Sequence, residues 1–297
     1  MKIRKDVDGL LLFEKNTGLN ILNDEIKIEL PDLSPRHVSI ALLNKCNLNC
    51  PYCYIRHDEN IIEYNELIKY VHVLDRNGCL SIGLGGGEPT LYSYLDELLS
   101  EISDTEMACT MTTNGSESIE KYKKILDKIQ LLRFSMDGLK DVYEKNRKQS
   151  FEILLQKLIE LRAYSNNIGI NYLLTDETVE QLDDFRKIVL EIRPKEVLLI
   201  PCLDIGNKRI MTLDSEIKLK EWLSNNTDLP IAFSYSSIDL IDSDLMLPVQ
   251  SFDYAKQKYY FAHISAKKGI MKNVFEKNQI AIIDSLENAL SKYRKED

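Results

Sequence analysis

The side chains of this sequence best suited to hold a metal centre are three cysteines that lie close together. Cys46, Cys50 and Cys53 have the spacing C-x-x-x-C-x-x-C, while the other three of the six cysteines are scattered along the chain. Three thiolates can bind three irons of a cubane iron–sulfur cluster and leave the fourth iron without a protein ligand. That open position would let a small molecule bind the cluster and accept an electron.

A structural zinc site is an alternative use of the same cysteines. Zinc of this kind needs a fourth protein ligand to complete a tetrahedron. His57 follows Cys53 by four residues and is the local candidate. A zinc-stabilised binding module without catalysis therefore stays open at this point. Metal analysis separates the two, because a cubane contains iron and sulfide.

A glycine-rich run is the second feature with the chemistry of a binding site. The sequence GGGEPT at 85–90 comes directly after an apolar stretch. Glycine allows the backbone to approach a ligand closely, and Glu88 could pair with an ammonium group. The run also suits a simple turn into a helix with Thr90 as the N-cap. It lacks the Gly-Lys-Ser/Thr sequence of a phosphate-binding P-loop.

The segments that must position these residues alternate between strand-like and helix-like patterns. Apolar runs predict strands at 37–43, 80–84, 107–113, 131–136, 168–174 and 196–200. Helical spacing of apolar residues predicts helices near 62–76, 91–103, 117–128, 149–165 and 178–192. This alternation indicates parallel strands joined by right-handed crossovers. Six strands favour a partial barrel over a full eightfold one, and the active sites of such barrels lie at the carboxyl ends of the strands.

Both ends of the chain depart from this alternation. Two short apolar runs around Asn16-Thr17-Gly18 predict a β-hairpin. After the last strand, helices are expected near 214–225 and 280–293, with short β-like runs between them. The expected fold is therefore α/β: a partial (β/α)6 barrel with an N-terminal β-hairpin and a small C-terminal α+β extension. Its expected divisions are residues 1–35, 36–210 and 211–297.

Two more polar runs follow predicted strands, and with them the sequence resembles a known family. TTNG at 112–115 follows the third strand, and SMDG at 135–138 follows the fourth. Taken in order, the cysteine motif, the GGEP run, the TNG run and the S-x-D-G run resemble the signature elements of the radical S-adenosylmethionine (SAM) superfamily. The resemblance spans roughly residues 36–205.

This resemblance implies a pair of cofactors and a reaction. Cys46, Cys50 and Cys53 would hold one [4Fe–4S] cluster, and the amino and carboxylate groups of SAM would chelate its open iron. An electron from the cluster would cleave the sulfonium and form a 5′-deoxyadenosyl radical, which abstracts a hydrogen atom from the substrate. An electron donor such as flavodoxin or ferredoxin would be the partner that reduces the cluster.

The resemblance also implies roles for residues at the strand ends. Glu88 would meet the amino group of SAM, and Ser135 would bond its methionyl or ribose groups. Arg147 would meet the carboxylate of SAM, and Asn171 would approach the ribose. The implied SAM-contacting residues are Tyr52, Gly86, Gly87, Glu88, Pro89, Thr113, Asn114, Ser135, Asp137, Arg147 and Asn171.

The substrate is left open between two classes. The S-x-D-G run resembles relatives that act on peptides and proteins. A peptide or protein is therefore the expected partner, with the chain after about residue 211 forming a channel wall and the hairpin edge pairing with an extended segment. Peptide-modifying relatives often carry C-terminal cysteines for auxiliary clusters, whereas no cysteine follows Cys202 here. A small molecule such as a nucleotide or sugar is the alternative substrate.

Composition restricts the setting in which the protein works. Of its 297 residues, 44% are hydrophobic and 29% are charged, which is ordinary for a globular protein. A formal net charge of −9 argues against nucleic-acid binding by the whole surface. No run approaches the roughly 18 apolar residues of a membrane span, and the apolar run near the N-terminus is too short for a signal peptide. We therefore expect a cytoplasmic enzyme with no membrane or nucleic-acid partner.

Overall fold

The computed structural model describes most of the chain, and its gaps fall mainly towards the C-terminus. The described residues are 1–55, 57–203, 210–233, 260–265, 269–271 and 286–295. Much of the segment expected to form a channel wall therefore lies outside the described residues. The same holds for residues 280–285 of the helix expected near 280–293.

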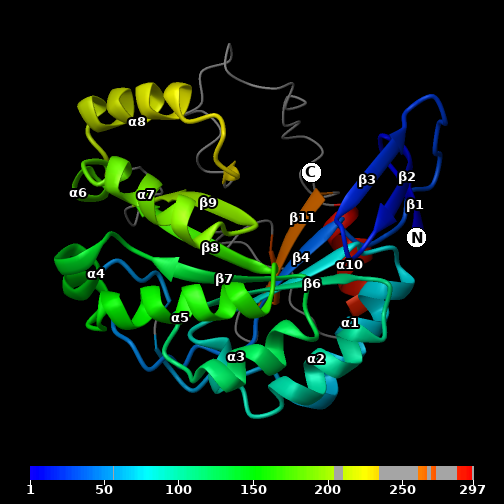
Figure 1. The fold of residues 1–297 in the computed structure, drawn as a ribbon. Helices are drawn as coiled ribbons and strands as arrows, with labels where there is room; N and C mark the ends of the chain where they lie inside the picture. The colour runs from blue at the N-terminus through cyan, green and yellow to red at the C-terminus, as the bar shows by residue number, and fades with distance from the viewer. Residues whose placement is uncertain (56, 204–209, 234–259, 266–268, 272–285, 296–297) are drawn as a thin grey trace.

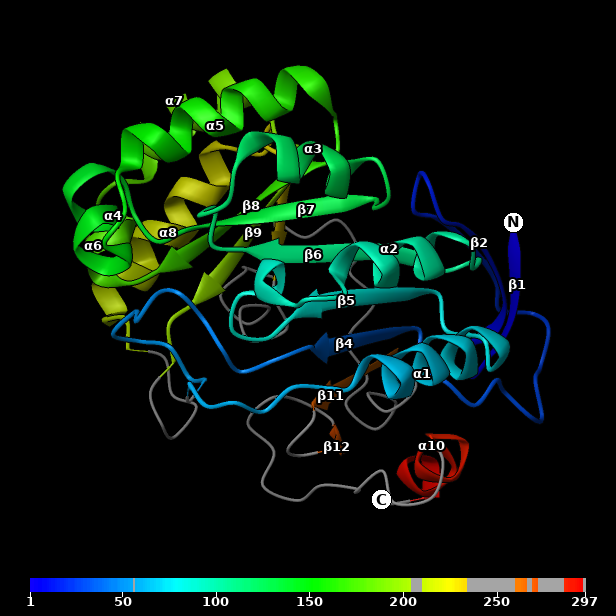
Figure 2. The same cartoon turned by 90° about the horizontal axis from the view of Figure 1, so that it is seen from below.

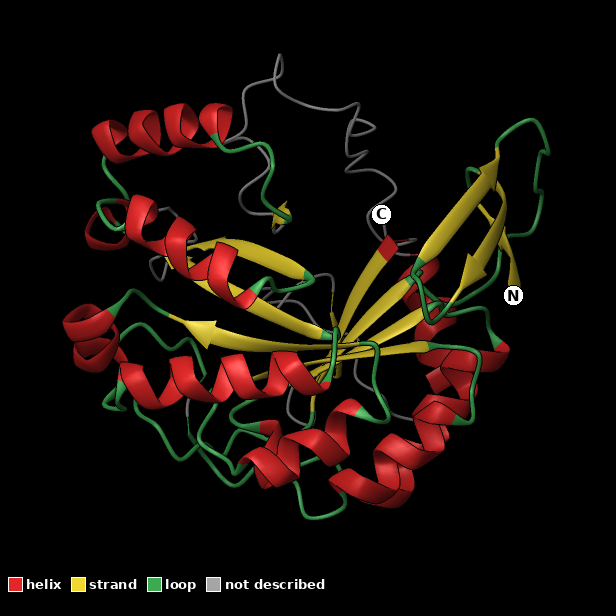
Figure 3. Ribbon diagram, in the orientation of Figure 1, coloured by secondary structure: helices red, strands yellow, loops and turns green. Residues whose placement is uncertain are grey.

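A curved sheet forms the centre of the molecule (Figures 1 and 3). Its nine strands have the order β10-β9-β8-β7-β6-β5-β4-β11-β12. All neighbouring pairs are parallel except β11 and β12. The strands are β4 (His37–Ala41), β5 (Ser81–Gly85), β6 (Ala108–Thr113), β7 (Leu131–Met136), β8 (Ile168–Leu174), β9 (Glu196–Pro201), β10 (Ile231–Phe233), β11 (Phe261–Ser265) and β12 (Gly269–Met271). The six strands expected from the sequence are β4 to β9, so the α/β partial barrel is confirmed, and β10 and β11 extend it at either edge.

Helices cover the outer face of this sheet, as Figure 2 shows from below. The helices are α1 (Tyr64–Arg76), the 3₁₀ helix η1 (Pro89–Leu91), α2 (Leu95–Ser103), α3 (Ile119–Leu126), α4 (Lys140–Arg147), α5 (Phe151–Tyr164), α6 (Asp176–Val179), α7 (Leu182–Ile192), α8 (Leu213–Asn225) and α10 (Leu286–Lys295). Ser118 and Ser150 cap α3 and α5 by accepting hydrogen bonds from backbone N–H groups of the first turn. No helix among the described residues is long and apolar enough to cross a membrane.

The two faces of the sheet differ in chemistry, because side chains alternate along each strand. On the outer face, residues such as Ile82, Leu84 and Phe134 are fully buried beneath the helices. On the inner face, the same strands carry small and polar residues, among them Ser81 and Ser135. The sheet therefore has an apolar core on its outer side and a polar lining on its inner side.

A separate three-stranded sheet precedes the barrel. β1 (Lys2–Asp6), β2 (Gly9–Glu14) and β3 (Leu19–Asn23) pair antiparallel in that order. β2 and β3 are the expected hairpin, and β1 adds a strand that the sequence did not indicate. Leu11 and Phe13 of β2 pack on Leu80, which precedes β5, and on Ala108 at the start of β6. The hairpin is thus part of a sheet that is fixed to the core.

A buried ion cluster, the basal cluster, ties this N-terminal sheet to both β4 and β11. Its members are Arg4, Asp6, Asp8, Arg36 and Tyr260. Arg36 donates to Asp6 Oδ2 at 2.9 Å and to Asp8 Oδ2 at 2.9 Å. The Tyr260 hydroxyl donates to Asp8 Oδ2 at 2.7 Å, and its ring lies under the Arg36 guanidinium at 4.5 Å. The cluster joins residues from the two ends of the chain at the amino ends of the barrel strands.

Candidate active site

The cysteine motif lies in the loop that follows β4. Cys46 and Cys50 are half-buried and Cys53 is exposed. Cys46 Sγ accepts a hydrogen bond from the backbone N–H of Leu48 at 3.4 Å. Burial raises the pKa values of Cys50 and Cys53, and neighbouring cysteines of the motif raise them further. Cys53 therefore lies within electrostatic reach of both Cys46 and Cys50.

His57, the fourth ligand of the zinc alternative, is exposed to solvent. Among the described residues, no three His, Cys, Asp or Glu side chains converge closely enough to hold a single metal ion. A cubane differs in this respect, because it spreads its thiolate ligands over separate irons.

Gly86 and Gly87 hold the cysteine loop against the end of β5. The N–H of Gly87 donates to Leu43 O at 2.7 Å, and the N–H of Glu88 donates to Lys45 O at 2.9 Å. A Cβ atom on Gly86 would lie 2.3 Å from Leu43 O. A Cβ atom on Gly87 would lie 2.1 Å from Lys45 O. Only glycine permits this contact between two backbones, and the contact fixes the loop over the carboxyl end of the sheet.

Glu88 joins the end of β5 to the end of β6. Its carboxylate is 1% exposed. Oε1 accepts hydrogen bonds from Thr90 N at 3.2 Å, Thr90 Oγ1 at 2.7 Å and Thr113 Oγ1 at 2.8 Å. Oε2 accepts one from Asn114 N at 2.8 Å. The contact of Glu88 with the SAM amino group stays a prediction, while the structure shows the carboxylate bound by donors of the GGEP and TNG runs.

Asn114 connects the hydrogen-bonded Glu88 carboxylate to the cysteine loop. Its side-chain amide donates to Asn47 Oδ1 at 2.8 Å and to Cys46 Sγ at 3.8 Å. Asn47 in turn donates to Ser116 Oγ at 2.9 Å. Sequence reasoning missed Asn47, because an asparagine between cysteines has the same appearance as any loop asparagine. The amide of Asn114 thus supplies a hydrogen bond to a sulfur that is predicted to bind the cluster.

A third group brings together residues from three motifs. The Tyr52 hydroxyl donates to Asp137 Oδ2, and Arg147 Nε donates to the same oxygen. Asn146 Nδ2 donates to the Asp137 carbonyl at 2.8 Å. Burial and the Asp137 carboxylate raise the pKa of Tyr52, so the phenol stays protonated as a donor. Tyr52 thereby anchors the cysteine loop to the end of β7 and to α4. The contact of Arg147 with SAM stays a prediction.

Ser135 and Asn171 lie side by side on the inner face of β7 and β8, where they are register partners. Both are buried. Asn171 Nδ2 donates to Thr112 Oγ1 at 3.4 Å. Asn171 Oδ1 has no hydrogen-bond partner in the described part of the chain. A buried acceptor without a partner costs free energy, so a ligand that donates to Asn171 would remove that cost.

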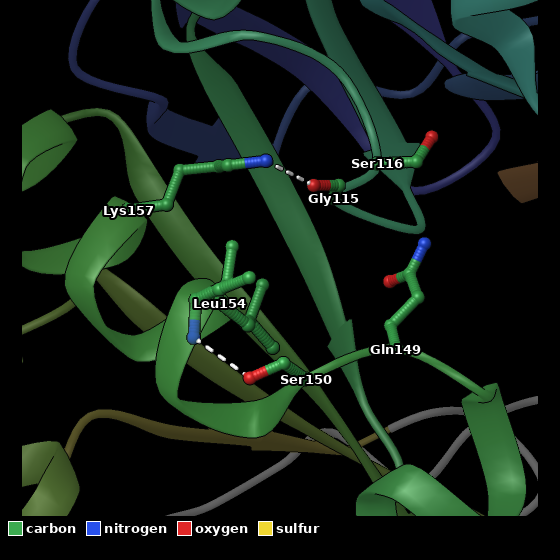
Figure 4. A pocket seen from close by; sticks show the side chains of 7 residues that line it. Gly115, Ser116, Gln149, Ser150, Leu154 and Lys157 are labelled. Carbon is green, nitrogen blue, oxygen red and sulfur yellow. Dashed lines mark hydrogen bonds between the residues drawn. The ribbon is translucent and has the colours of Figure 1, made fainter.

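Figure 4 shows a pocket between the β6–α3 loop and the first turns of α5. Its volume is about 200 Å³, and Gly115, Ser116, Gln149 and Lys157 are among its lining residues. Lys157 Nζ donates to the carbonyl oxygens of Gly115 and Glu117, each at 2.6 Å. The pocket contains none of the predicted SAM-contacting residues. Lys157 fixes the loop that carries Asn114 from the helix side.

The sequence model of the radical SAM superfamily matches residues 40–189, about half of the chain. This chain belongs to the radical SAM superfamily. It is therefore an enzyme of the family that uses a [4Fe–4S] cluster and SAM, and the zinc-stabilised binding module is set aside.

Two relatives with similar sequences have names that refer to nucleotides. A GTP 3′,8-cyclase of Clostridium botulinum is 26% identical over 223 residues, which covers 69% of this chain and 68% of the relative. An S-adenosylmethionine-dependent nucleotide dehydratase of a Thermoplasmatales archaeon is 24% identical over 176 residues, covering 58% of this chain and 64% of the relative.

Solved structures with the same fold include peptide-bound proteins. Streptococcus suis SuiB bound to the precursor peptide SuiA has a TM-score of 0.76 and 14% identity, covering 97% of this chain and 86% of that one. The structure of anSMEcpe with AdoMet and the Cp18Cys peptide has a TM-score of 0.67 and 20% identity, covering 89% and 80%. At these identities the similarity establishes a common fold.

The residues of this site fit a cluster and SAM. Three thiols lie together on one loop at the carboxyl end of the sheet. Gly85, on the inner face at the end of β5, has nothing within 4 Å of the position of a Cβ atom. Asn171 Oδ1 offers a buried acceptor without a partner in the described residues. Ligand sulfurs, free space and an unused acceptor thus occur at the same end of the sheet.

Proposed function

We propose that this radical SAM enzyme modifies a peptide or protein by hydrogen-atom abstraction. The observation that carries the proposal is the outer edge of β3, whose sequence LNILN has no charge and with which no described strand pairs. Edge strands usually carry charges or prolines that prevent pairing. Leu19 and Ile21 of β3 are 51% and 48% exposed. An extended peptide can add to such an edge through main-chain hydrogen bonds.

Two further observations support a peptide substrate. The S-x-D-G run of this chain resembles relatives that act on peptides and proteins. The fold shared with SuiB extends over 97% of the chain and so includes the N-terminal sheet. Both support a peptide substrate, because the SuiB structure contains a bound precursor peptide.

The chemistry divides between the cofactors and the side chains described above. When bound, the cluster and SAM supply a one-electron cleavage that yields the 5′-deoxyadenosyl radical. Cys46, Cys50 and Cys53 would ligate the cluster, with the Asn114 amide directed at Cys46 Sγ. Asn171 would accept a hydrogen bond from SAM. A donor such as flavodoxin or ferredoxin would supply the electron that starts this cleavage.

A small-molecule substrate is the second candidate. The named relatives, a GTP 3′,8-cyclase and a nucleotide dehydratase, favour it. The absence of cysteines after Cys202 is in keeping with it, because auxiliary clusters are a feature of many peptide-modifying relatives.

Cofactor chemistry is tested with the anaerobically reconstituted protein. We expect about four irons per chain and formation of 5′-deoxyadenosine from SAM under strong reduction. Replacing Cys46, Cys50 and Cys53 together with alanine should abolish both. Cys109→Ala is the matched control, because burial raises the pKa of this thiol to about 12 and keeps it protonated. A triple variant that retained a full cluster would contradict the ligand assignment.

The substrate class is tested by mass spectrometry of anaerobic turnover, with candidate peptides compared with nucleotides and sugars. We expect a peptide to stimulate deoxyadenosine formation. Ile21→Lys should lower this stimulation at least tenfold and leave the rate without peptide unchanged, because a charge on an edge strand opposes pairing. Ile3→Lys on β1, the opposite edge, is the control. Stimulation by a small metabolite and by no peptide would replace the proposal with the second candidate.

A further inference from the structure

The inner face of the barrel carries a polar layer that the cofactor chemistry does not use. His37 lies on β4, Arg133 on β7 and Glu196 on β9. Register places Arg133, Gly169 and Glu196 side by side on adjacent strands, on the face opposite the helix-covered core. We call His37, Arg133 and Glu196 the barrel floor.

Two glycines in the middle of strands make room for these side chains. A Cβ atom on Gly83 would lie 3.0 Å from His37 Nε2. A Cβ atom on Gly169 would lie 3.1 Å from Arg133 Cγ. Glycine weakens a strand interior and often marks a close approach of other groups. His37 and Arg133 therefore lie flat on the sheet, each across a neighbouring strand.

The hydrogen bonds within the floor leave specific atoms unused. Arg133 Nε and Nη2 both approach Glu196 Oε1 at 2.7 Å. Arg133 Nη1 and Glu196 Oε2 have no hydrogen-bond partner among the described residues. The two side chains remain 19% and 28% exposed. The ion pair thus presents one donor group and one acceptor atom towards the inside of the barrel.

His37 adds a neutral group to the floor. Its Nδ1 lies 2.8 Å from Ser81 Oγ, and its ring stacks on Phe261 with centroids 5.7 Å apart. Burial, together with the charge of Arg133, lowers the pKa of His37 to about 4. The imidazole is therefore uncharged at neutral pH, and the floor has no net charge.

The floor is matched to a neutral group with both a donor and an acceptor. Arg133 is the one Lys or Arg at the inner positions of the described barrel strands, and Glu196 neutralises it. A nucleoside triphosphate requires several uncompensated cations or a metal ion, and a carboxylate beside the single arginine would repel it. An amide has an N–H for Glu196 Oε2 and a carbonyl oxygen for Arg133 Nη1.

We propose that the barrel floor binds a primary carboxamide group of the substrate and so determines specificity. This inference rests on the proposed function and deepens it, because it names the substrate chemistry that the barrel recognises. Arg133, Glu196 and His37 act in binding and do not contact the cysteine loop.

The test measures binding, which separates it from the turnover assay of the proposed function. The probes are the capped tripeptide acetyl-Gly-Asn-Gly-amide, its Asp counterpart and GTP, each titrated into the cluster-loaded enzyme with SAM. We expect the Asn tripeptide to bind at least tenfold more tightly than the Asp tripeptide. Glu196→Gln should reverse this preference and raise the affinity for GTP, because it leaves Arg133 uncompensated. Arg133→Met should lower the affinity for the Asn tripeptide at least tenfold.

Arg186→Met is the matched control, since Arg186 forms an exposed ion pair with Asp228 outside the barrel. It should leave all three affinities unchanged. The proposal is overturned if the Asn tripeptide does not bind at millimolar concentration, or if Glu196→Gln leaves the preference unchanged. Tighter binding of GTP than of the tripeptides by the wild type also overturns it. If peptides bind as expected while only a small metabolite is turned over, the amide site stands and the proposed substrate class fails.

Discussion

At the scale of single residues, Glu88 shows how a carboxylate in a binding motif can be occupied by its own protein. Four hydrogen bonds from Thr90, Thr113 and Asn114 surround it. They connect two strand ends and the residue that approaches Cys46. The GGEP and TNG runs therefore work as one unit, in which the acid of the first run positions the amide of the second.

Glu88→Ala should destabilise the fold as well as weaken SAM binding. The substitution leaves the buried backbone N–H groups of Thr90 and Asn114 without an acceptor, which costs roughly 2–4 kcal/mol of unfolding free energy. Chemical denaturation of the cluster-free protein measures this loss. Exposed Glu97→Ala on α2 should change stability by about 0.5 kcal/mol or less. If the variant kept its stability but lost its affinity for SAM, Glu88 would contact SAM directly and would not stabilise the fold.

At the scale of elements, the sequence was most informative where apolar residues are regularly spaced. The strands predicted at 131–136 and 168–174 have the observed bounds of β7 and β8. β1 was missed because its inward residues are Lys2, Arg4 and Asp6, which reverse the usual pattern of burial. α4 was missed because Tyr143 is its one buried residue, so no apolar period marks it.

The junction of the cysteine loop with β5 gives a prediction whose control lies two residues earlier in the chain. Gly87→Ala would place a Cβ atom 2.1 Å from Lys45 O, so the loop must move away from the strand. We expect the variant to lose most of its iron and to unfold at a lower temperature. Gly85→Ala, which meets nothing within 4 Å, should keep both wild-type iron content and thermal stability. Equal iron content in the two variants would contradict a role for this contact.

At the scale of the whole molecule, the site depends on pairings that no local pattern indicates. The order of polar runs along the chain located the strand ends, and parallel topology gathered them at one end of the sheet. The pairing of β11 with β4 was not foreseen, because it joins Phe261 to His37 and depends on the complete fold. The same is true of the basal cluster, in which Tyr260 contacts Asp8.

The basal cluster should contribute strongly to global stability. Arg36→Met leaves the buried Asp6 carboxylate with less compensation, and loss of one partner of a buried ion pair costs about 3–5 kcal/mol. Burial raises the pKa of Asp6, but the hydrogen bonds and charges of Arg36 and Arg4 lower it below 3.8 overall.

This depressed pKa gives the cluster a defined pH dependence. Its stabilisation is present above about pH 4 and is lost as the pH falls further. Urea unfolding at pH 7 and below pH 4 should show a smaller acid effect in Arg36→Met than in the wild type. Arg186→Met, which breaks an exposed pair, should cost about 1 kcal/mol or less. An equal loss in both variants would contradict the role of the cluster.

The position of β11 in the sheet also has a consequence for the nascent chain. β4 leaves the ribosome early, but the strand that covers its second edge, Phe261–Ser265, is made near the end of synthesis. At about 5–20 residues per second, the wait is on the order of ten to fifty seconds. During that time an apolar strand, HVSIA, has one open edge that a neighbouring nascent chain could pair with. Chaperones that shield open strand edges should therefore matter more for the yield of this protein than for one whose first strand is paired by its neighbours in sequence.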